Sequence, residues 1–248
     1  KVNMSLSEEE MKCLLSYYNS LEKPEIVLCN SFDKHSNLLH WREKWYVVYD
    51  RHFSQLLKDL NRIFFFEENE IDAYKIIAQI YAEELFLKGK FVKSGQFINS
   101  FFKKDKKKYC MNPEFEEVLK IQEAFIISHE LAHWFYFRIQ EKEKVSRALD
   151  MHYEKCRGYF DEVEREKTVQ AADDKIIKLV FHYFKVNPGI QEESYCDISA
   201  ITFLLAHFKV LSNLNSIEAA SAAFLALYAM QLPGFIKYSV NAYYTYHL

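Results

Sequence analysis

Residues 114–140 contain neither glycine nor proline, and the middle of this segment is apolar at almost every position. A helix that is apolar on all its faces is buried in the interior of a protein. Asn112 and Pro113 precede the segment, in the order that favours an N-cap followed by the first helical position. The sequence therefore predicts a long buried helix over residues 112–140, around which the other elements pack.

Polar residues interrupt this apolar segment in the pattern His129-Glu130-x-x-His133. Residues four apart lie on one face of a helix, so both imidazoles can bind one ion. Glu130 is offset by one position and can accept a proton from a metal-bound water without being a ligand. Neutral imidazole suits Zn2+, and a catalytic zinc site has three protein ligands and one open position. We expect one Zn2+ ion here, with a third ligand from elsewhere in the chain.

A second group of polar residues, Gln191 to Asp197, opens a later apolar helix. Glu193 and Asp197 are four residues apart, so both lie on one face of the helix and can contact the same neighbouring group. We predict Glu193 as the third metal ligand and Asp197 as the acceptor that orients His129 or His133. Two alternatives remain open at this point. Glu192 is a second candidate ligand, and acids near a helix N-terminus also occur without any metal.

The two motifs together resemble those of the gluzincin clan of zinc metallopeptidases, in which His-Glu-x-x-His on one helix is completed by Glu-x-x-x-Asp on a later one. The long interval between His133 and Glu193 is unlike that of thermolysin-type enzymes. It is more similar to small gluzincins with an inserted helical section, including CAAX-processing-type and cytoplasmic Lit-type phage-exclusion peptidases. This resemblance implies a zincin-like core and hydrolysis of a peptide bond in a protein or peptide substrate.

Other candidate residues have less support from their spacing. Cys196 has no second cysteine at metal-ligand spacing, so we interpret it as a small core residue. His207 lies too far along its helix to reach the same ion. An oxyanion donor is not identified by the sequence, and three residues remain candidates for it: Tyr195, His152 and His182.

Composition narrows the class of protein. Half of the 248 residues are hydrophobic, and only five glycines and four prolines occur, which is typical of a mostly helical domain. A net charge of −3 gives no support for a nucleic-acid partner. Five cysteines do not form a disulfide framework of the secreted type, which indicates a reducing compartment, the cytoplasm.

Residues 219–236 carry no charge and are nearly long enough to span a membrane. The segment is rich in alanine and contains Pro233-Gly234. We therefore expect a buried helix that ends in a turn at these two residues, and we do not expect this segment to place the protein in a membrane.

The remaining patterns predict strands at 25–29 and 44–49 and helices at 7–19, 51–64 and 70–88. Strand 44–50 or an expected strand at 108–111 is a candidate open edge for an extended substrate. The lysine-rich stretch 101–109 is interpreted as a solvated loop or a strand edge blunted by lysine, and contact with an anionic surface is the alternative.

Together these patterns predict a single, predominantly helical α+β domain over residues 1–248, with a small sheet and a buried His-Glu-x-x-His helix. Its parts are helices and sheet (1–111), the active-site helix (112–140), an inserted charged helical section (141–187), and the third-ligand helix with C-terminal helices (190–248). The expected function is zinc peptidase activity, restrained by a regulatory partner. The alternative is a non-catalytic domain with a structural metal site or a protein-interaction role.

Overall fold

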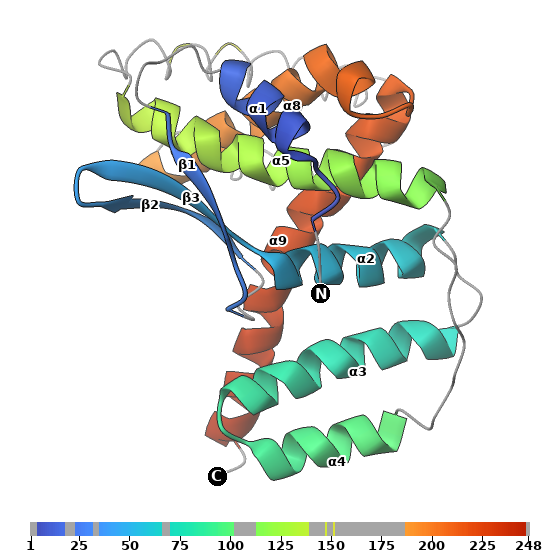
Figure 1. The fold of residues 1–248 in the computed structure, drawn as a ribbon. Helices are drawn as coiled ribbons and strands as arrows, with labels where there is room; N and C mark the ends of the chain where they lie inside the picture. Colours follow the sequence, from blue (N-terminus) through green and yellow to red (C-terminus); the bar gives the residue numbers. More distant parts are fainter. Residues whose placement is uncertain are drawn as a thin grey trace, which may run out of the picture.

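The computed structural model describes residues 4–17, 23–31, 35–65, 70–101, 113–138, 147, 151 and 187–246. Within these residues the protein is predominantly helical with one small sheet, which confirms the predicted α+β class (Figure 1). The elements are α1 (Glu8–Tyr17), β1 (Glu25–Cys29), β2 (Ser36–Trp41), β3 (Lys44–Asp50), α2 (Arg51–Phe65), α3 (Glu70–Leu87), α4 (Phe91–Phe101), α5 (Pro113–Arg138), α8 (Pro188–Leu211) and α9 (Ser216–Tyr246).

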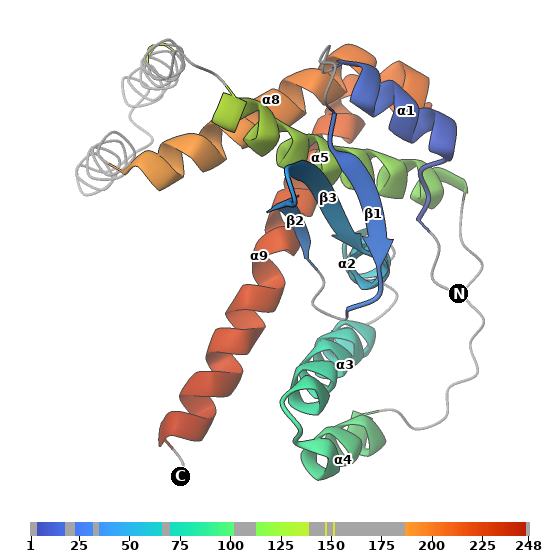
Figure 2. The ribbon, with the colours of Figure 1, turned by 60° about the vertical axis from the view of Figure 1, so that its left-hand side comes forward.

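Helix α5 occupies the centre of the fold. It contacts α8 and α9 on one side and α1, α2 and the sheet on others (Figures 1 and 2). Between Leu119 and Ala132 all its side chains except Lys120 are buried, as its apolar sequence predicts. Burial on every face explains why α5 shows little amphipathic character although it lies at the middle of the core.

The sheet has the strand order β1-β3-β2, with β1 parallel and β2 antiparallel to β3. The predicted strands at 25–29 and 44–49 are confirmed, but β2 lies in a stretch where no strand was expected. Arg42 and Glu43 connect β2 to β3 and have φ values of 48° and 64°. Both central residues of a two-residue hairpin turn of type I′ have positive φ, a conformation usually signalled by asparagine or glycine. Because Arg-Glu carries no such signal, the hairpin was missed.

The position of β3 corrects one expectation about the sheet. Residues 44–50 form the central strand, whose hydrogen-bonding groups on both sides face neighbouring strands. Residues 44–50 are therefore not an open edge, and among the described strands β1 and β2 are the edges. Strand β2 also lies against α5, the helix that carries His-Glu-x-x-His.

Helix ends agree with local capping chemistry. At α1, Ser7 and Glu10 form the predicted capping box, in which each backbone N–H donates to the other side chain at 2.7 and 3.2 Å. At α8, the Asn187 side chain accepts from the N–H groups of Gly189 and Ile190, and Pro188 occupies the first helical position. Helix α8 therefore begins at Pro188 and includes Gly189, two residues before the start expected at residue 190.

Helix α9 buries the alanine-rich face of the uncharged segment. Among its side chains described by the structure, residues 216–231, the buried ones are Ala219, Ala222, Ala223, Ala226 and Ala229, as expected of a helix packed closely on a core. The predicted turn at Pro233-Gly234 is wrong, because α9 continues through both residues to Tyr246. Proline removes one helical hydrogen bond but has helical φ, so the residues on either side carry the helix onward. Among the described helices, none has the length and apolar character needed to cross a bilayer.

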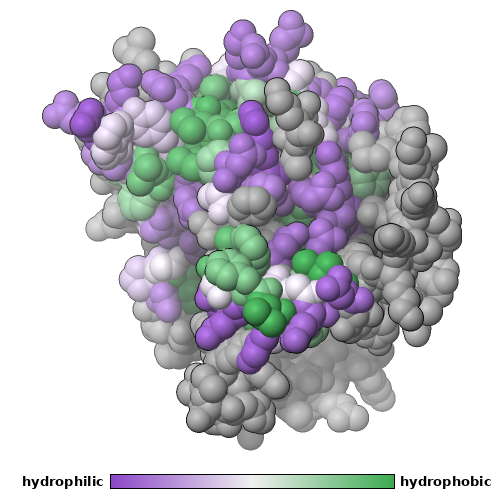
Figure 3. Space-filling model, turned by 60° about the horizontal axis from the view of Figure 1, so that its bottom comes forward, coloured by the Kyte–Doolittle hydropathy of each residue, from purple (hydrophilic) through white to green (hydrophobic). Residues whose placement is uncertain are grey.

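Helices α3 and α4 form a hairpin at the bottom of the molecule in Figure 1, a side that is turned toward the viewer in Figure 3. The helix predicted at 70–88 is confirmed as α3, whereas α4 was not anticipated. Three other expectations lie outside the described residues: the strand at 108–111, nearly all of the lysine-rich stretch 101–109 and most of the charged helical section 141–187.

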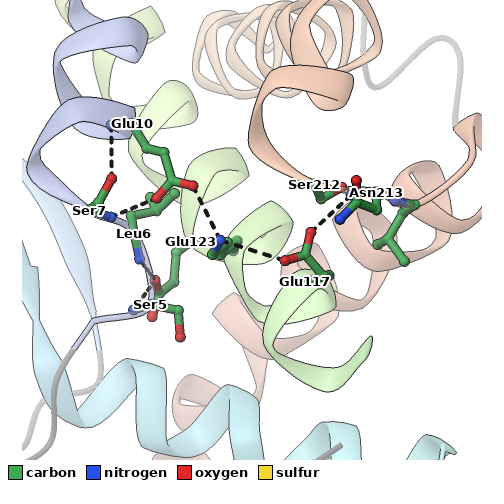
Figure 4. A network of polar contacts seen from close by, with 10 residues as sticks. Ser5, Leu6, Ser7, Glu10, Glu117, Glu123, Ser212 and Asn213 are labelled. Carbon is green, nitrogen blue, oxygen red and sulfur yellow. Dashed lines mark hydrogen bonds and ion pairs between the residues drawn. The ribbon is translucent and has the colours of Figure 1, made fainter. Parts of the chain in front are cut away.

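A buried carboxylate ties the N-terminal segment to α5 (Figure 4). Glu123 is fully buried and accepts hydrogen bonds from the backbone N–H groups of Ser5 and Leu6 and from the Ser54 hydroxyl at 2.6–3.0 Å. Burial raises the pKa of Glu123 to about 7, although these three donors lower it. The protonated carboxyl is therefore favoured in the folded state relative to the unfolded chain.

This raised pKa predicts an unusual pH dependence of stability. The folded state holds the proton of Glu123 more tightly than the unfolded state, so the contribution of this residue is greatest below pH 4.5 and is lost as pH rises to about 7. Chemical unfolding at several pH values should show Glu123→Gln gaining up to about 3 kcal/mol relative to the wild type across this range. The exposed Glu116→Gln on the same helix is the control, and parallel curves for all three proteins would contradict the prediction.

Candidate metal centre

Helices α5 and α8 pack side by side and bring the two predicted motifs together (Figure 2). The Nε2 atoms of His129 and His133 lie 3.1 Å apart. The Glu193 carboxylate places Oε2 at 3.4 Å from Nε2 of His129 and Oε1 at 3.6 Å from Nε2 of His133. Two imidazole nitrogens and one carboxylate group, from two helices, therefore converge on one small volume.

These separations match the demands of a tetrahedral metal ion. Zinc–nitrogen and zinc–oxygen bonds of about 2.0 Å place two tetrahedral ligand atoms about 3.3 Å apart. The two nitrogens are 3.1 Å apart, and each has a different oxygen of the Glu193 carboxylate at 3.4 or 3.6 Å, so each of these separations is close to that value. Within the described parts of the chain, His129, His133 and Glu193 are the one group of at least three His, Cys, Asp or Glu residues with converging ligand atoms. Their donor atoms therefore fit a divalent cation.

The Nδ1 atoms of both imidazoles, called the outer nitrogens because they lie on the far side of each ring from the cluster, face carboxylates. His129 Nδ1 is 2.8 Å from Asp197 Oδ1, and His133 Nδ1 is 2.8 Å from Glu192 Oε1. A neutral imidazole that donates from Nδ1 has its lone pair on Nε2. In that tautomer both Nε2 lone pairs and the Glu193 carboxylate are directed at the same small volume. Three acceptors at this distance repel one another unless a cation or a proton lies between them.

The electrostatics of these side chains show the same excess of negative charge. Burial lowers the pKa of His129, but Asp197 and Glu193 outweigh it and raise this pKa to about 9. The pKa of His133 is likewise raised, against the effect of burial, by Glu193 and Glu192. Hydrogen bonding to the two histidines holds the pKa of Glu193 far below its ordinary value. Groups that stabilise an imidazolium also stabilise a bound cation.

Glu130 lies beside this cluster and not within it. It is 5% exposed, and burial raises the pKa of its carboxyl, while His129, His133 and the backbone N–H of Leu38 lower it. A carboxylate with a raised pKa is a stronger base than an exposed one. Its position next to both histidines, on the helix that carries them, suits a proton acceptor at the metal site.

The cluster is buried on the side of α5 and open on the side of α8. The side chains of His129 and His133 are 4% and 14% exposed, whereas that of Glu193 is 61% exposed. A metal ion held here would keep a face toward solvent. That arrangement is typical of a site with an open coordination position and differs from a closed structural zinc site.

Other sequence candidates lie at or near the cluster. Cys196 is fully buried on α8, where burial raises the pKa of its thiol. The Tyr195 ring contacts the ring of Tyr136 at 5.5 Å, and burial and Glu192 raise the pKa of Tyr136. His207 contacts Phe203 on α8. His152 and His182 lie outside the described residues.

Glu192, a second candidate ligand in the sequence, lies at Nδ1 of His133, a position that the sequence did not predict. The signal was the doubling of acids at 192 and 193, since two neighbouring helical residues point about 100° apart and reach different atoms. Comparisons with family models, with curated proteins and with solved structures find no match. The site is therefore interpreted from its own geometry.

Removing one of the two converging Nε2 atoms should abolish metal binding. His133→Ala takes away one of three converging ligand atoms, and we expect purified protein to lose its bound metal and the melting temperature to become insensitive to a chelator. His207→Ala removes an imidazole of α8 that faces Phe203, and should retain both properties. Elemental analysis and thermal melting check this, and stoichiometric metal in His133→Ala would contradict the assignment.

The outer carboxylates should affect affinity without being ligands. Asp197→Asn and Glu192→Gln remove the negative charge next to each Nδ1, and loss of such partners typically weakens metal binding 10- to 100-fold. Competition with a chromophoric chelator measures this change. The exposed Glu218→Gln on α9 should bind metal like the wild type; affinities equal to it in both site variants would exclude an orienting role.

Proposed function

We propose that this protein is a zinc-dependent peptidase that hydrolyses a peptide bond in a protein or peptide substrate. His129, His133 and Glu193 would be the zinc ligands, Glu130 the proton acceptor, and Asp197 and Glu192 the groups that orient the two imidazoles. The observation that carries the proposal is the convergence of two Nε2 atoms and one carboxylate within 3.6 Å, beside a buried glutamate. Two nitrogens and one carboxylate oxygen form a donor set that zinc accepts.

When bound, zinc supplies a Lewis acid that lowers the pKa of a coordinated water and polarises the scissile carbonyl. Glu130 takes one proton from the attacking water as the new C–O bond forms. It then delivers this proton to the amine nitrogen as the C–N bond breaks. The raised pKa of Glu130 suits both steps, because a carboxyl group of higher pKa accepts a proton more readily and still releases it to an amine.

The openness of the cluster favours catalysis over a structural metal. A structural zinc site is closed by four protein ligands and has no use for a neighbouring base. Here three ligand atoms converge, Glu193 faces solvent, and Glu130 stands beside the cluster. The combination resembles the gluzincin arrangement, and the sparse cysteines support a reducing, cytoplasmic location.

An extended substrate would bind along the outer edge of β2. This strand is an edge of the sheet and contacts α5. The backbone N–H of its Leu38 lowers the pKa of Glu130. An edge strand binds extended peptides through main-chain hydrogen bonds. The Phe137 ring stacks on Trp45 at 5.9 Å, one helical turn beyond His133, and is half exposed. This aromatic pair would contact an apolar side chain of the substrate.

Replacing the proton acceptor should separate binding from chemistry. Glu130→Gln keeps the size of the side chain and all three metal ligands, so we expect normal metal content with cleavage reduced about 10²- to 10⁴-fold. Mass spectrometry of new N-termini in a proteome-derived peptide library measures cleavage. Glu218→Gln is the control with full activity. Equal turnover by Glu130→Gln would rule out this mechanism, and an inactive, metal-loaded wild type would favour a non-catalytic role.

A further inference from the structure

The end of the α3–α4 hairpin exposes large apolar side chains. Phe86 and Phe91 are 57% and 60% exposed, and Val92 is 75% exposed. The two phenylalanine rings contact each other edge to face at 5.0 Å across the turn, and Leu87 beside them is 42% exposed. A cluster of this kind on the surface of a soluble domain marks a contact site.

Lysines alternate with these apolar residues. The sequence from Phe86 to Lys93 is Phe-Leu-Lys-Gly-Lys-Phe-Val-Lys, and no acidic residue occurs between Glu84 and Asp105. Lys90 and Lys93 are exposed and Lys88 is half-buried. The tip of the hairpin, residues 86–93, therefore combines apolar surface with three positive charges, whereas the whole chain carries a net charge of −3.

The turn is built to hold this tip in one shape. The N–H of Lys90 donates to the Leu85 carbonyl and the N–H of Gly89 to the Phe86 carbonyl, both at 2.9 Å, which is the Schellman arrangement at a helix end. Gly89 has a φ of 73°, which a side chain would strain. No heavy atom lies within 4 Å of a Cβ placed there, so the turn faces open space.

The tip also lies at the margin of the fold. Among the described side chains of α4, Ser94 alone is buried, and its hydroxyl donates to the Ala82 carbonyl of α3. Figures 1 and 2 show the hairpin at the opposite side of the molecule from α8, and Figure 3 shows hydrophobic patches bordered by hydrophilic side chains on that side. The tip is thus distant from the metal centre.

We propose that the tip of the α3–α4 hairpin docks on the surface of an anionic lipid bilayer. The apolar side chains of Phe86, Phe91 and Val92 would enter the boundary between headgroups and acyl chains. The lysines would bind lipid phosphates while their methylene stems lie along the apolar surface. The positive charges complement an anionic surface, and the exposed apolar residues lie at a turn that faces open space, which fits a bilayer better than a protein groove. No spanning helix is needed, and the proposal does not depend on peptidase activity.

Vesicle sedimentation with the full chain tests the proposal. The wild type should sediment with vesicles of phosphatidylcholine and phosphatidylglycerol, bind vesicles of phosphatidylcholine alone much less, and dissociate as salt is added. The double variant Phe91→Ser with Val92→Ser should lose at least about tenfold in binding to these vesicles. Lys90→Glu with Lys93→Glu should lose at least about 25-fold, about fivefold for each charge removed.

A control variant distinguishes binding by the tip from nonspecific binding by exposed apolar residues elsewhere on the surface. Ile217 and Phe224 on α9 are 77% and 61% exposed and have no neighbouring lysine in the sequence, so Ile217→Ser with Phe224→Ser should bind vesicles like the wild type. Circular dichroism confirms that every variant is folded. Absence of wild-type binding to anionic vesicles would overturn the proposal, as would equal losses in the α9 control. Retained metal content in the tip variants distinguishes this result from failure of the metal centre.

Discussion

The packing of α5 against α8 imposes the constraint on which the proposed chemistry depends. It directs the Nε2 atoms of His129 and His133 at each other from 3.1 Å, with the Glu193 carboxylate closing the third side. Asp197 lies at Nδ1 of His129 and Glu192 at Nδ1 of His133. In the tautomer that carries its proton on Nδ1, both Nε2 atoms therefore have a lone pair. Such an arrangement of acceptors is stable only around positive charge.

The rest of the fold holds these two helices in place. Helix α5 is buried by the sheet, α1, α2, α8 and α9, so its rotation about its own axis is set by close packing on every side. The hydrogen bonds of Glu123 join α5 to the N-terminal segment and to α2. On the other side of the site, Asn187 caps α8 shortly before Glu192 and Glu193, which determines where that helix begins.

Features that depend on neighbouring residues in the sequence could be predicted. The spacing of His129 and His133, the capping box of Ser7 and Glu10 and the burial of α5 all follow from helical periodicity or from contacts within one turn. Predictions failed where long-range pairing overrode a local signal. Strand β2 forms because β3 supplies its hydrogen-bonding partner, and it turns at Arg42-Glu43 although neither residue favours positive φ.

The sequence by itself therefore determined that two histidines and one glutamate share a buried helix, and that carboxylates stand one turn apart on a later helix. Only the tertiary structure decided which carboxylate meets which nitrogen. Glu192 and Glu193 are neighbours, and the choice between them depends on how α8 is rotated as it packs on α5. That rotation arises from contacts across the core, because each residue turns a helix by about 100° and local sequence does not specify the partner surface.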